Sequence, residues 1–540
     1  MPKIILAINA GSSSVKVSVF SYHPTTSPNN PPSSKDNRDQ IDTSLTELAQ
    51  IQISNLTASP ALLTYTRQGS SNNSSSPTTP NKNSPLPASI STPRTAFQKI
   101  LSVLLQDPDL PDLNSPADIT VAVHRIVHGG GDFSTPTFLD DDETVAHLER
   151  LSDLAPLHNG GALEIVAAVR ELGGSSKGDD GDDGDKGGKG AEGGKKVRNL
   201  GLFDNMFHST LPLEERSYMI SPAKARSEGL RRYGFHGLSC AFITRAVGAW
   251  LERNQADPSP PPSSFPGQHQ QHRQQQQDQQ SHPARDGGGG GGGPNLIALH
   301  LGSGCSATCI RAGVSIATSM GLTPVSGLPG ATRSGDVDPS LIFHYTHSAG
   351  RLSTASAADA EKTSEEGGGN KMHITRAETI LNKESGWKSL AGTTDFGALC
   401  EKAFPSSSSS SSSSSTNNNT TTNEEEERKL AHLAFTILVS RIVDFIAAYY
   451  VKLRGEVDAL VFAGGIGEKG SILREAVVER IQCLGFEIDG DLNTSPSFKG
   501  GEDVVAEIGR QGAKHRVVIC QTDEQREMAR ECVGVMGGEF

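Results

Sequence analysis

One local pattern constrains this chain more than any other: a strand, a turn of small residues and a returning strand, found near the N-terminus. Residues 4–20 begin with an apolar run from Ile4 to Ile8, and Val15, Val17 and Val19 then alternate with polar residues. Period-two alternation predicts a half-buried β-strand. The turn at 10–14 has no bulky side chain, so its backbone N–H groups and hydroxyls can approach an anion. By itself the pattern also fits an ordinary hairpin with a serine-rich turn.

The same pattern returns at residues 295–318. An apolar strand at 296–301 leads to a small turn at 302–304, and strands at 305–310 and 314–317 follow. A repeat over this distance predicts two related α/β domains that face each other across a cleft, each with a turn able to bind phosphate.

Six segments interrupt these domains with Ser, Asn, Pro, Gly, Gln or single-sign charge. Such compositions bury too little apolar surface to offset chain entropy, so we expect surface loops there. They lie near 23–40, 66–95, 173–198, 253–294, 354–370 and 404–428. The rest amounts to roughly 350–400 residues, enough for two ordinary domains.

Charge and cysteine content narrow the function classes. A net charge of -13 argues against general binding to nucleic acid or acidic membranes, but it leaves room for a local basic pocket. The seven cysteines are odd in number and lack zinc-ribbon spacing, which favours reduced, mostly buried thiols in a cytoplasmic protein. The apolar helix expected at 429–453 contains His432, Arg441 and Asp444, so we predict a buried helix and not a membrane span.

Ionisable side chains follow several predicted elements. The strand at 119–123 ends at His124 and Arg125 before a glycine run, and the strand at 199–203 ends at Asp204. His158 precedes a helix expected from 162, where an anion would be favoured. His236 lies between glycines ahead of a helix that Ser239 is expected to cap. Taken singly, each also fits a structural role, as a charged loop, a helix cap or a core histidine.

Two further segments complete the pattern. Arg333 lies in a polar turn at 330–336, where a guanidinium could clamp a transferring phosphoryl group. A strand at 457–462, a glycine loop at 463–470 and a helix at 471–484 form a nucleotide-binding layout, although the loop lacks the Gly-Lys-Ser/Thr ending of a P-loop. A strand at 516–520 and a helix at 525–535 close the chain.

Taken in order, these segments resemble the acetate kinase family, within the superfamily of acetate and sugar kinases, heat-shock chaperones and actin. The resemblance covers everything except the inserts. It is carried by the segments at 9–14, 124–130, 155–159, 203–204, 232–237, 300–304, 318–321, 332–336, 465–468 and 522–524.

The resemblance implies a fold and a site. It implies an N-terminal actin-like (ribonuclease H-like) domain of residues 1–204 with a closing helix from 523–540, and a nucleotide-binding domain of residues 205–522. Catalytic roles are implied for Arg125, His158, Asp204, His236 and Arg333. Arg125 would also bind substrate, together with a small acyl pocket of Val127, Leu157, Phe235 and Pro324. Magnesium, or manganese as its substitute, would be held by Asn9 and Glu524.

ATP or ADP is the implied co-substrate, and a homodimer is the implied assembly. The implied nucleotide contacts are Ser12, Ser14, Lys16, His300, Leu301, Gly302, Ser303, Gly304, Asp395, Phe396, Gly397, Gly465, Ile466, Gly467, Glu468 and Lys469. The implied reaction is reversible, magnesium-dependent in-line transfer from ATP to acetate.

The chain departs from the family pattern mainly on the nucleotide side. Ser303 stands where the family usually has Asn, and Gly397 where it usually has Arg. Gly160, Leu238 and Cys240 also differ from the common residues. The sequence therefore leaves open a diphosphate donor, a propionate or butyrate acceptor, and a non-catalytic actin-like clamp. The retained Arg125, His158, His236 and Arg333 argue against the clamp.

Overall fold

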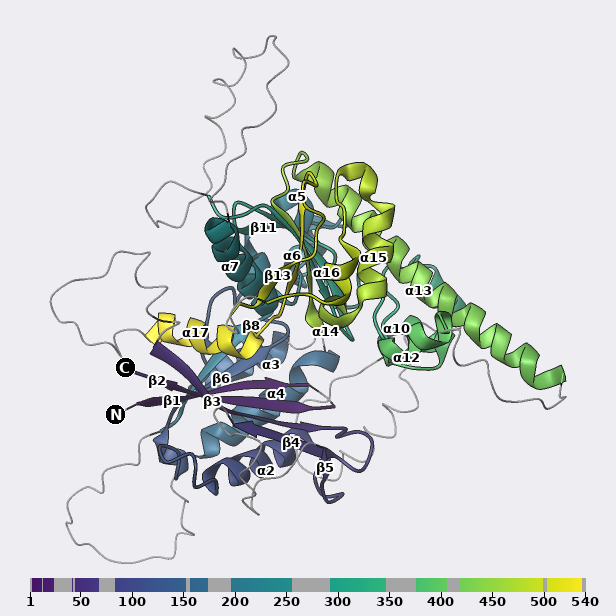
Figure 1. The fold of residues 1–540 in the computed structure, drawn as a ribbon. Coiled ribbons are helices and arrows are strands. Elements are labelled where there is room, and N and C mark those ends of the chain that lie inside the picture. Colours follow the sequence, from purple (N-terminus) through teal and green to yellow (C-terminus); the bar gives the residue numbers. More distant parts are fainter. Residues whose placement is uncertain are drawn as a thin grey trace, which may run out of the picture.

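The computed structural model describes residues 2–11, 13–23, 41, 44–67, 83–151, 156–172, 196–254, 292–345, 375–405, 418–498 and 503–536. The side chains of 156–158 and 418–422 lie outside this description. Two β-sheets with helices on their faces form the molecule, one from the N-terminal part and one from the C-terminal part (Figure 1).

The first sheet has eight strands in the order β5-β4-β3-β2-β1-β6-β8-β7. β1, β2 and β3 form an antiparallel meander, and β6 and β8 then extend it in parallel to β1. The strands are β1 (Lys3–Ala10), β2 (Val15–Tyr22), β3 (Leu45–Ser54), β4 (Leu62–Arg67), β5 (Ser84–Pro85), β6 (Ile119–Ile126), β7 (Thr137–Phe138) and β8 (Arg198–Phe203).

Both faces of this sheet are covered because β1 is apolar on both sides. Ile4, Leu6 and Ile8 pack in one cluster with side chains of α2 (Pro93–Leu105) and α4 (Pro156–Glu171). Ile5 and Ala7 face the opposite side, where α17 (Glu524–Met536) packs on them. The last described helix of the chain therefore lies on the first sheet, as Figure 1 shows in yellow. α3 (Asp142–Leu151) packs through Leu148 with Ile126 of β6 and Phe203 of β8, and η1 (Pro116–Asp118) precedes β6.

The second sheet has six strands in the order β11-β10-β9-β12-β14-β13. Its strands are β9 (Leu296–Leu301), β10 (Cys305–Arg311), β11 (Val314–Thr318), β12 (Ala459–Ala463), β13 (Val505–Glu507) and β14 (Arg516–Cys520). β9, β10 and β11 form an antiparallel meander, and β12 and β14 continue in parallel to β9. This is the same order as β3-β2-β1-β6-β8, so the repeat expected from the sequence is confirmed.

Helices cover the second sheet on both faces as well. α7 (Gly237–Asn254) packs on one face, and α11 (Gly386–Ala391), α12 (Phe396–Ala403), α13 (Asn418–Lys452) and α15 (Ser471–Arg480) lie on the other. The shorter elements are η3 (Met206–Thr210), α5 (Leu213–Arg216), α6 (Pro222–Ser227), α8 (Leu341–Tyr345), α10 (Arg376–Lys383), α14 (Gly464–Lys469), η5 (Gln482–Leu484) and α16 (Gly490–Thr494).

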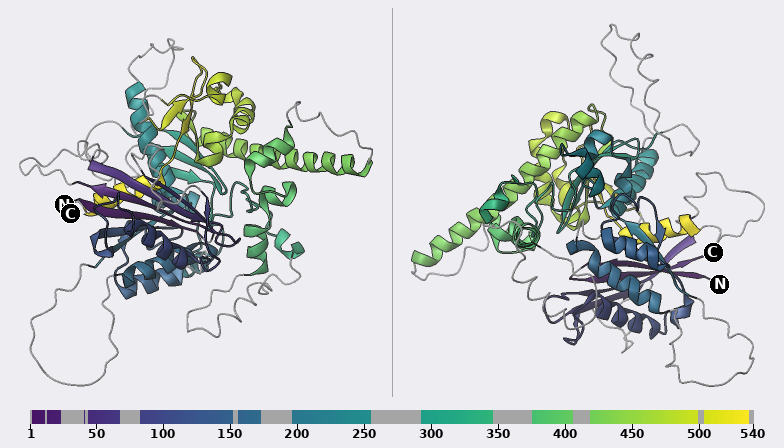
Figure 2. Two further views of the ribbon diagram at one scale, coloured as in Figure 1. Left: turned by 60° about the horizontal axis from the view of Figure 1, so that its bottom comes forward. Right: turned by 180° about the vertical axis from the view of Figure 1, so that it is seen from behind.

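α13 is the one helix in the described part of the chain that is long and apolar enough to cross a membrane by length and composition. Its apolar residues instead serve the core, where Phe435, Leu438, Ile442 and Ile446 pack against β9, β10 and β12. The N-terminal end of α13 projects beyond the neighbouring helices (Figure 2). The helix expected at 429–453 is therefore buried along one face only, since Leu433, Ile437 and Val451 are exposed. All seven cysteines are free and five are buried, as expected.

Several boundaries differ from the sequence-based expectations. β3 and β4 occupy a stretch for which the sequence predicted no element, β5 and the start of α2 fall inside the predicted 66–95 loop, and α13 already begins inside the predicted 404–428 loop. The polar residues at 418–428 are compatible with helix because the exposed end of a long helix needs no apolar face. What remains of the six predicted inserts lies mostly outside the described residues.

Three helix starts also move. α4 begins at Pro156, a residue whose fixed φ suits the first turn, so His158 lies inside the helix and not ahead of it. α7 begins at Gly237, so Ser239 is not its cap. The predicted glycine loop at 463–470 is largely the short helix α14.

Candidate active site

The parallel strands β1, β6 and β8 are neighbours, and their carboxyl ends bring together Asn9, Arg125 and Asp204. Asn9 is level with Arg125 in the β1–β6 register, and Asp204 directly follows β8. Arg125 donates two hydrogen bonds to Asp204, from Nε to Oδ1 at 2.9 Å and from Nη2 to Oδ2 at 2.6 Å. Its Nη1 also donates to Asn9 Oδ1 at 3.2 Å. The bidentate pairing holds the guanidinium plane fixed at the sheet edge.

Glu524 reaches the same place from the far end of the chain. It is the first residue of α17, and its Oε2 lies 3.2 Å from Arg125 Nη1 and accepts a 3.2 Å hydrogen bond from Asn9 Nδ2. Asn9, Asp204 and Glu524 thus offer amide and carboxylate oxygens, the ligand types that a magnesium ion prefers. Within the described residues there is no cluster of three or more His, Cys, Asp or Glu side chains suited to a metal ion. Magnesium commonly uses one or two carboxylates and completes its shell with water and substrate phosphates, so this oxygen set fits.

Burial and charge act against each other on the Arg125–Asp204 pair. Burial raises the pKa of the Asp204 carboxyl above its ordinary value, and the guanidinium of Arg125 opposes that rise. Burial acts to lower the pKa of Arg125, but Asp204 and Glu524 outweigh it and hold that pKa above its ordinary value. Arg125 therefore remains a cation at the sheet edge.

A second group of side chains comes from the other domain. His236 bonds through Nδ1 with Ser306 Oγ at 2.9 Å, and its ring lies 4.2 Å from the ring of His300, centroid to centroid. A Cβ added at Gly304 would lie 2.7 Å from Arg333 Nη1 and 3.6 Å from His236 Nε2. The missing side chain at Gly304 is thus the space in which Arg333 and His236 converge.

His236 is held in the neutral form. Burial, with the neighbouring His300 and the cations of Arg125 and Arg333, keeps the pKa of His236 well below its ordinary value. Burial also lowers the pKa of Arg333. The backbone of His236 has φ of +61°, a left-handed conformation that is strained for a residue with a Cβ and is typical of functional sites.

A close backbone contact joins the two groups. Gly237 N donates to the Asp204 carbonyl at 2.8 Å, and a Cβ at Gly237 would lie 2.1 Å from that oxygen. Only glycine fits at position 237. Because His236 directly precedes Gly237, this contact holds His236 close to the end of β8, where Asp204 lies.

The predicted acyl pocket is partly assembled. Phe235 packs with Tyr233 and Met320 in a small apolar cluster, and Val127 lies against it. Pro324 is buried in the loop that follows Met320. The side chains of Leu157 and His158 lie outside the described residues, although their backbones belong to the first turn of α4.

The predicted nucleotide residues fall into separate places. Lys16 faces the same side as Asn9, its partner in the β1–β2 register. Ser14 closes the first turn by accepting from Gly11 N at 2.9 Å through its carbonyl, and Ser12 lies outside the described residues. His300 and Leu301 end β9, and Gly302 to Gly304 form the turn to β10.

α14 contains Gly465, Ile466, Gly467, Glu468 and Lys469. Gly464 has φ of +73°, and a Cβ there would lie 2.7 Å from the Leu301 carbonyl, so this helix starts directly against the end of β9. Glu468 Oε1 accepts from Thr522 N at 3.3 Å, which ties α14 to the segment that leads to Glu524.

The segment from Asp395 to Gly397 has structural duties. The Asp395 side chain caps α12 by accepting from Gly397 N at 2.7 Å and Ala398 N at 3.1 Å. Phe396 is buried between Trp387 and Phe435. Asp395 and Gly397 both stay exposed at the start of α12, while Phe396 does not.

Sequence reasoning missed two positioning residues. His128 Nε2 bonds with the Leu322 carbonyl at 3.1 Å while its ring packs against Tyr233 and Phe235, so it braces their apolar cluster. Arg474 is fully buried and donates to the carbonyls of Gly467 and Glu468 in α14. His128 lies within a segment that resembles the family, but nothing in the local pattern around Arg474 singles it out.

The fold consists of two related α/β halves, and the family to which the chain belongs gives its class, a phosphotransferase with a carboxyl group as acceptor. The family model of the acetokinase family matches residues 4–177, 192–259 and 292–530, and the chain belongs to this family. A probable acetate kinase of Chaetomium globosum is 43% identical over 548 residues, covering 98% of each chain. An acetate kinase of Streptomyces coelicolor is 31% identical over 78% of this chain and 77% of its own.

Solved structures show the same fold. The chain is similar to the acetate kinase of Porphyromonas gingivalis, with a TM-score of 0.62, 24% identity and coverage of 99% of this chain and 100% of that one. It is also similar to a propionate kinase of Francisella tularensis, with a TM-score of 0.63, 22% identity and coverage of 98% of both chains.

Proposed function

We propose that this protein is an acetate kinase that transfers the terminal phosphoryl group of ATP reversibly to the carboxylate of acetate. Membership of the acetokinase family makes it a phosphotransferase with a carboxyl group as acceptor. The observation that carries the proposal is the convergence of Arg333 and His236 at Gly304. The Gly237–Asp204 backbone bond brings this group to the strand end where Arg125 and Asp204 pair.

Charge is the main obstacle in this reaction. Acetate is ionised at neutral pH, so the nucleophile needs no strong general base, but it must approach a polyanionic phosphate. Arg125 would bind the acetate carboxylate and Arg333 the transferring phosphoryl group. In phosphoryl-transfer enzymes one such arginine is worth about 10³–10⁵ in rate.

His236 and Asp204 have different parts. A neutral His236, fixed by Ser306, would stabilise charge on the transferring group through Nε2, with His158 nearby. Asp204 would orient Arg125 and lie beside the metal, and it is not required as a proton acceptor. Val127, Leu157, Phe235 and Pro324 would enclose the acetate methyl.

Asn9 and Glu524 would hold Mg²⁺, with Asp204 beside them, and Mn²⁺ would bind in its place. The bound ion would neutralise charge on the nucleotide phosphates. One domain would contact these phosphates through Lys16 and through the first turn, with Ser12 and Ser14. The other domain would contact the nucleotide through residues 300–304 and 465–469. We extend the proposal to a cytoplasmic homodimer. Each subunit would have an N-terminal domain of residues 1–204 with 523–540 and a second domain of residues 205–522.

A diphosphate donor is the second candidate. The exposed Gly397 and Ser303 stand where the family usually has larger polar residues, and Asp395 and Phe396 are used in the cap and core of α12. Fewer side chains are then left for the adenine nucleotide. The small apolar cluster around Phe235 also leaves propionate and butyrate to be compared as acceptors.

Hydroxylamine trapping of acyl phosphate tests the proposal. The protein is incubated with ATP or diphosphate and with acetate, propionate or butyrate, and hydroxamate is measured. We expect the highest kcat/KM for ATP with acetate. Trapped product with diphosphate alone would replace ATP as the donor, and no product with any pair would refute the kinase assignment.

Asp204→Asn tests the orienting role. The amide cannot hold Arg125 in the same bidentate pairing, so kcat should fall by about 10²-fold. Arg480→Gln, on the exposed side of α15, is the matched control and should leave kcat unchanged. Near wild-type turnover of Asp204→Asn at saturating magnesium would show that the role is wrongly assigned.

A further inference from the structure

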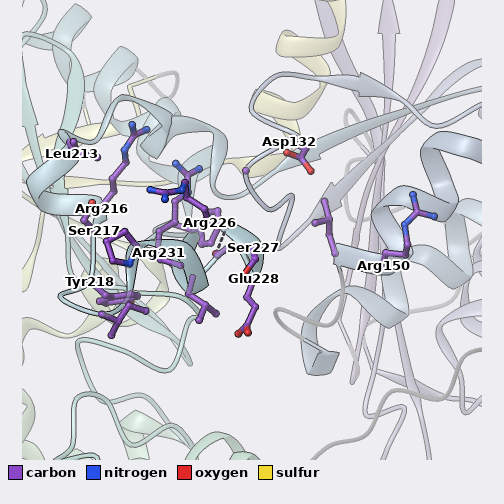
Figure 3. A pocket seen from close by; sticks show the side chains of 18 residues that line it. Asp132, Arg150, Leu213, Arg216, Ser217, Tyr218, Arg226, Ser227, Glu228 and Arg231 are labelled. Atoms are coloured by element: carbon purple, nitrogen blue, oxygen red, sulfur yellow. Dashed lines mark hydrogen bonds between the residues drawn. The ribbon is translucent and has the colours of Figure 1, made fainter.

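A large cavity lies away from the transfer site, between the N-terminal part of the molecule and the segment that joins the two sheets. Its volume is about 880 Å³, within the range of small-molecule sites. One wall carries Asp132, from the loop after β6, and Arg150, from α3. The opposite wall is the stretch from α5 through α6 to Tyr233 (Figure 3).

Four arginines line this cavity: Arg150, Arg216, Arg226 and Arg231. Among the residues that the structure describes, none of the four forms a salt bridge with a carboxylate. Arg231 stacks on the ring of Tyr233, with its Cζ 4.5 Å from the ring centroid. Figure 3 shows Arg150 across the cavity from Arg216, Arg226 and Arg231. Guanidinium groups on facing walls, without carboxylate partners among the described residues, create a positive potential between the walls that favours an anion.

The acidic side chains of the lining do not neutralise the arginines. The lining contains two carboxylates, Asp132 and Glu228, and Asp132 is already paired with His147 Nε2 at 3.0 Å. Among the described lining residues, four arginines stand against two carboxylates, a surplus of two positive charges on a chain whose overall charge is -13. Such a local reversal of sign concentrates anions against the field of the rest of the protein.

The remaining lining adds an organic component. Leu151, Leu213, Ile220 and Leu230 provide apolar surface, and Tyr218 provides both a ring and a hydroxyl. A small ion such as chloride would leave most of this volume unused. We propose that the cavity is a binding site for a small organic anion with two or more carboxylate or phosphate groups, which the arginines of both walls hold at once.

This site is separate from the transfer site. None of Arg125, Asp204, His236 or Arg333 lines it. The two sites share a wall, since Tyr233 lines the cavity and packs with Phe235, while the Tyr218 hydroxyl accepts from Leu322 N at 2.8 Å. The proposal goes beyond the phosphotransferase activity and does not depend on which donor or acceptor that activity uses.

Isothermal titration of the full chain with tricarballylate, a tricarboxylate, tests the proposal. Wild type should bind one equivalent, and added salt should weaken the binding. Arg150→Gln and Arg226→Gln each remove one exposed guanidinium, from opposite walls, and each should weaken binding about tenfold. Arg480→Gln is the matched control and should bind like wild type.

Binding at the transfer site is distinguished by Arg333→Gln, which should retain wild-type affinity for tricarballylate. Three results would each overturn the proposal. They are loss of binding in Arg333→Gln, unchanged binding in both Arg150→Gln and Arg226→Gln, and no saturable binding by wild type. Thermal unfolding without the anion verifies that the variants are folded. Hydroxamate formation measured without tricarballylate tests the kinase activity separately from anion binding.

Discussion

At Gly304 the absence of a side chain lets two functional groups of the second domain meet. Gly304→Ala would place a Cβ 2.7 Å from Arg333 Nη1, a distance that real Cβ atoms do not adopt, so the guanidinium must move. Because misplacing a positioning group by about 1 Å can cost about 10² in rate, we expect kcat to fall by about that factor while the unfolding midpoint changes little. Steady-state kinetics and urea unfolding measure the two effects.

Gly534→Ala is the control for this substitution, because a Cβ there meets nothing within 4 Å and the residue lies in α17. Unchanged kcat in Gly304→Ala would contradict the placement of Arg333 and His236 around this glycine.

Single residues also show what the sequence could and could not predict. Arg125 and Asp204 each stand at the end of a predicted strand, and their positions are confirmed. Their bidentate pairing joins residues 79 positions apart and depends on β6 and β8 being neighbours, which no local pattern specifies. The roles of these residues in catalysis stay predictions.

At the scale of an element, α14 depends on one buried arginine. Arg474 Nη1 donates to the Gly467 carbonyl at 2.8 Å and the Glu468 carbonyl at 2.9 Å, and its Nε donates to Asn493 Oδ1 at 2.8 Å. Arg474→Gln leaves buried carbonyls without donors, so we expect a loss of about 2–4 kcal/mol in unfolding free energy. Since α14 lies at the proposed nucleotide contacts, the KM for ATP should rise more than the KM for acetate.

Urea unfolding and the two KM values check this expectation, with Arg480→Gln in the same helix α15 as the control. An equal rise in both KM values would show that Arg474 supports the fold as a whole and not α14 in particular.

Elements were predicted best where one periodicity dominates. The apolar strands β1, β9 and β12 are so strongly patterned that their existence was evident, whereas β3 lies between segments of low complexity and was missed. α14 was expected to be a loop because four of its flanking and internal residues are glycine, yet the end of β9 and the donors of Arg474 stabilise a helical turn there. Tertiary contacts, invisible in local propensity, decide such cases.

For the whole molecule, the repeat at residues 4–20 and 295–318 was sufficient to predict two related sheets. It did not predict that α17 returns to the first sheet, because amphipathic spacing shows that a helix has an apolar face but not which sheet covers that face. The return of α17 was available only through the family resemblance. The Arg-rich cavity lay beyond sequence reasoning altogether, since its walls are far apart in the chain.

The buried histidines make the stability of the whole molecule depend on pH. Burial lowers the pKa of His124, His128, His208 and His300 to about 4 in the folded protein, against an ordinary value of 6.5. The folded state keeps these rings neutral while the unfolded chain protonates them, so their contribution is complete above pH 6.5 and is lost as the pH falls towards 4. Each ring contributes up to about 3 kcal/mol to this loss.

We therefore expect the unfolding free energy, measured in urea between pH 7 and pH 5, to fall steeply below pH 6.5. His124→Gln removes one of these rings and can keep a bond to Asn199, which pairs with His124 Nε2 at 2.9 Å. Its slope should be shallower by about 1.4 kcal/mol per pH unit, since one proton fewer is taken up on unfolding. His344→Gln, at an exposed position in α8, should keep the wild-type slope. An identical slope in His124→Gln and wild type would mean that His124 is already protonated in the folded protein, and that its burial does not exclude the charge.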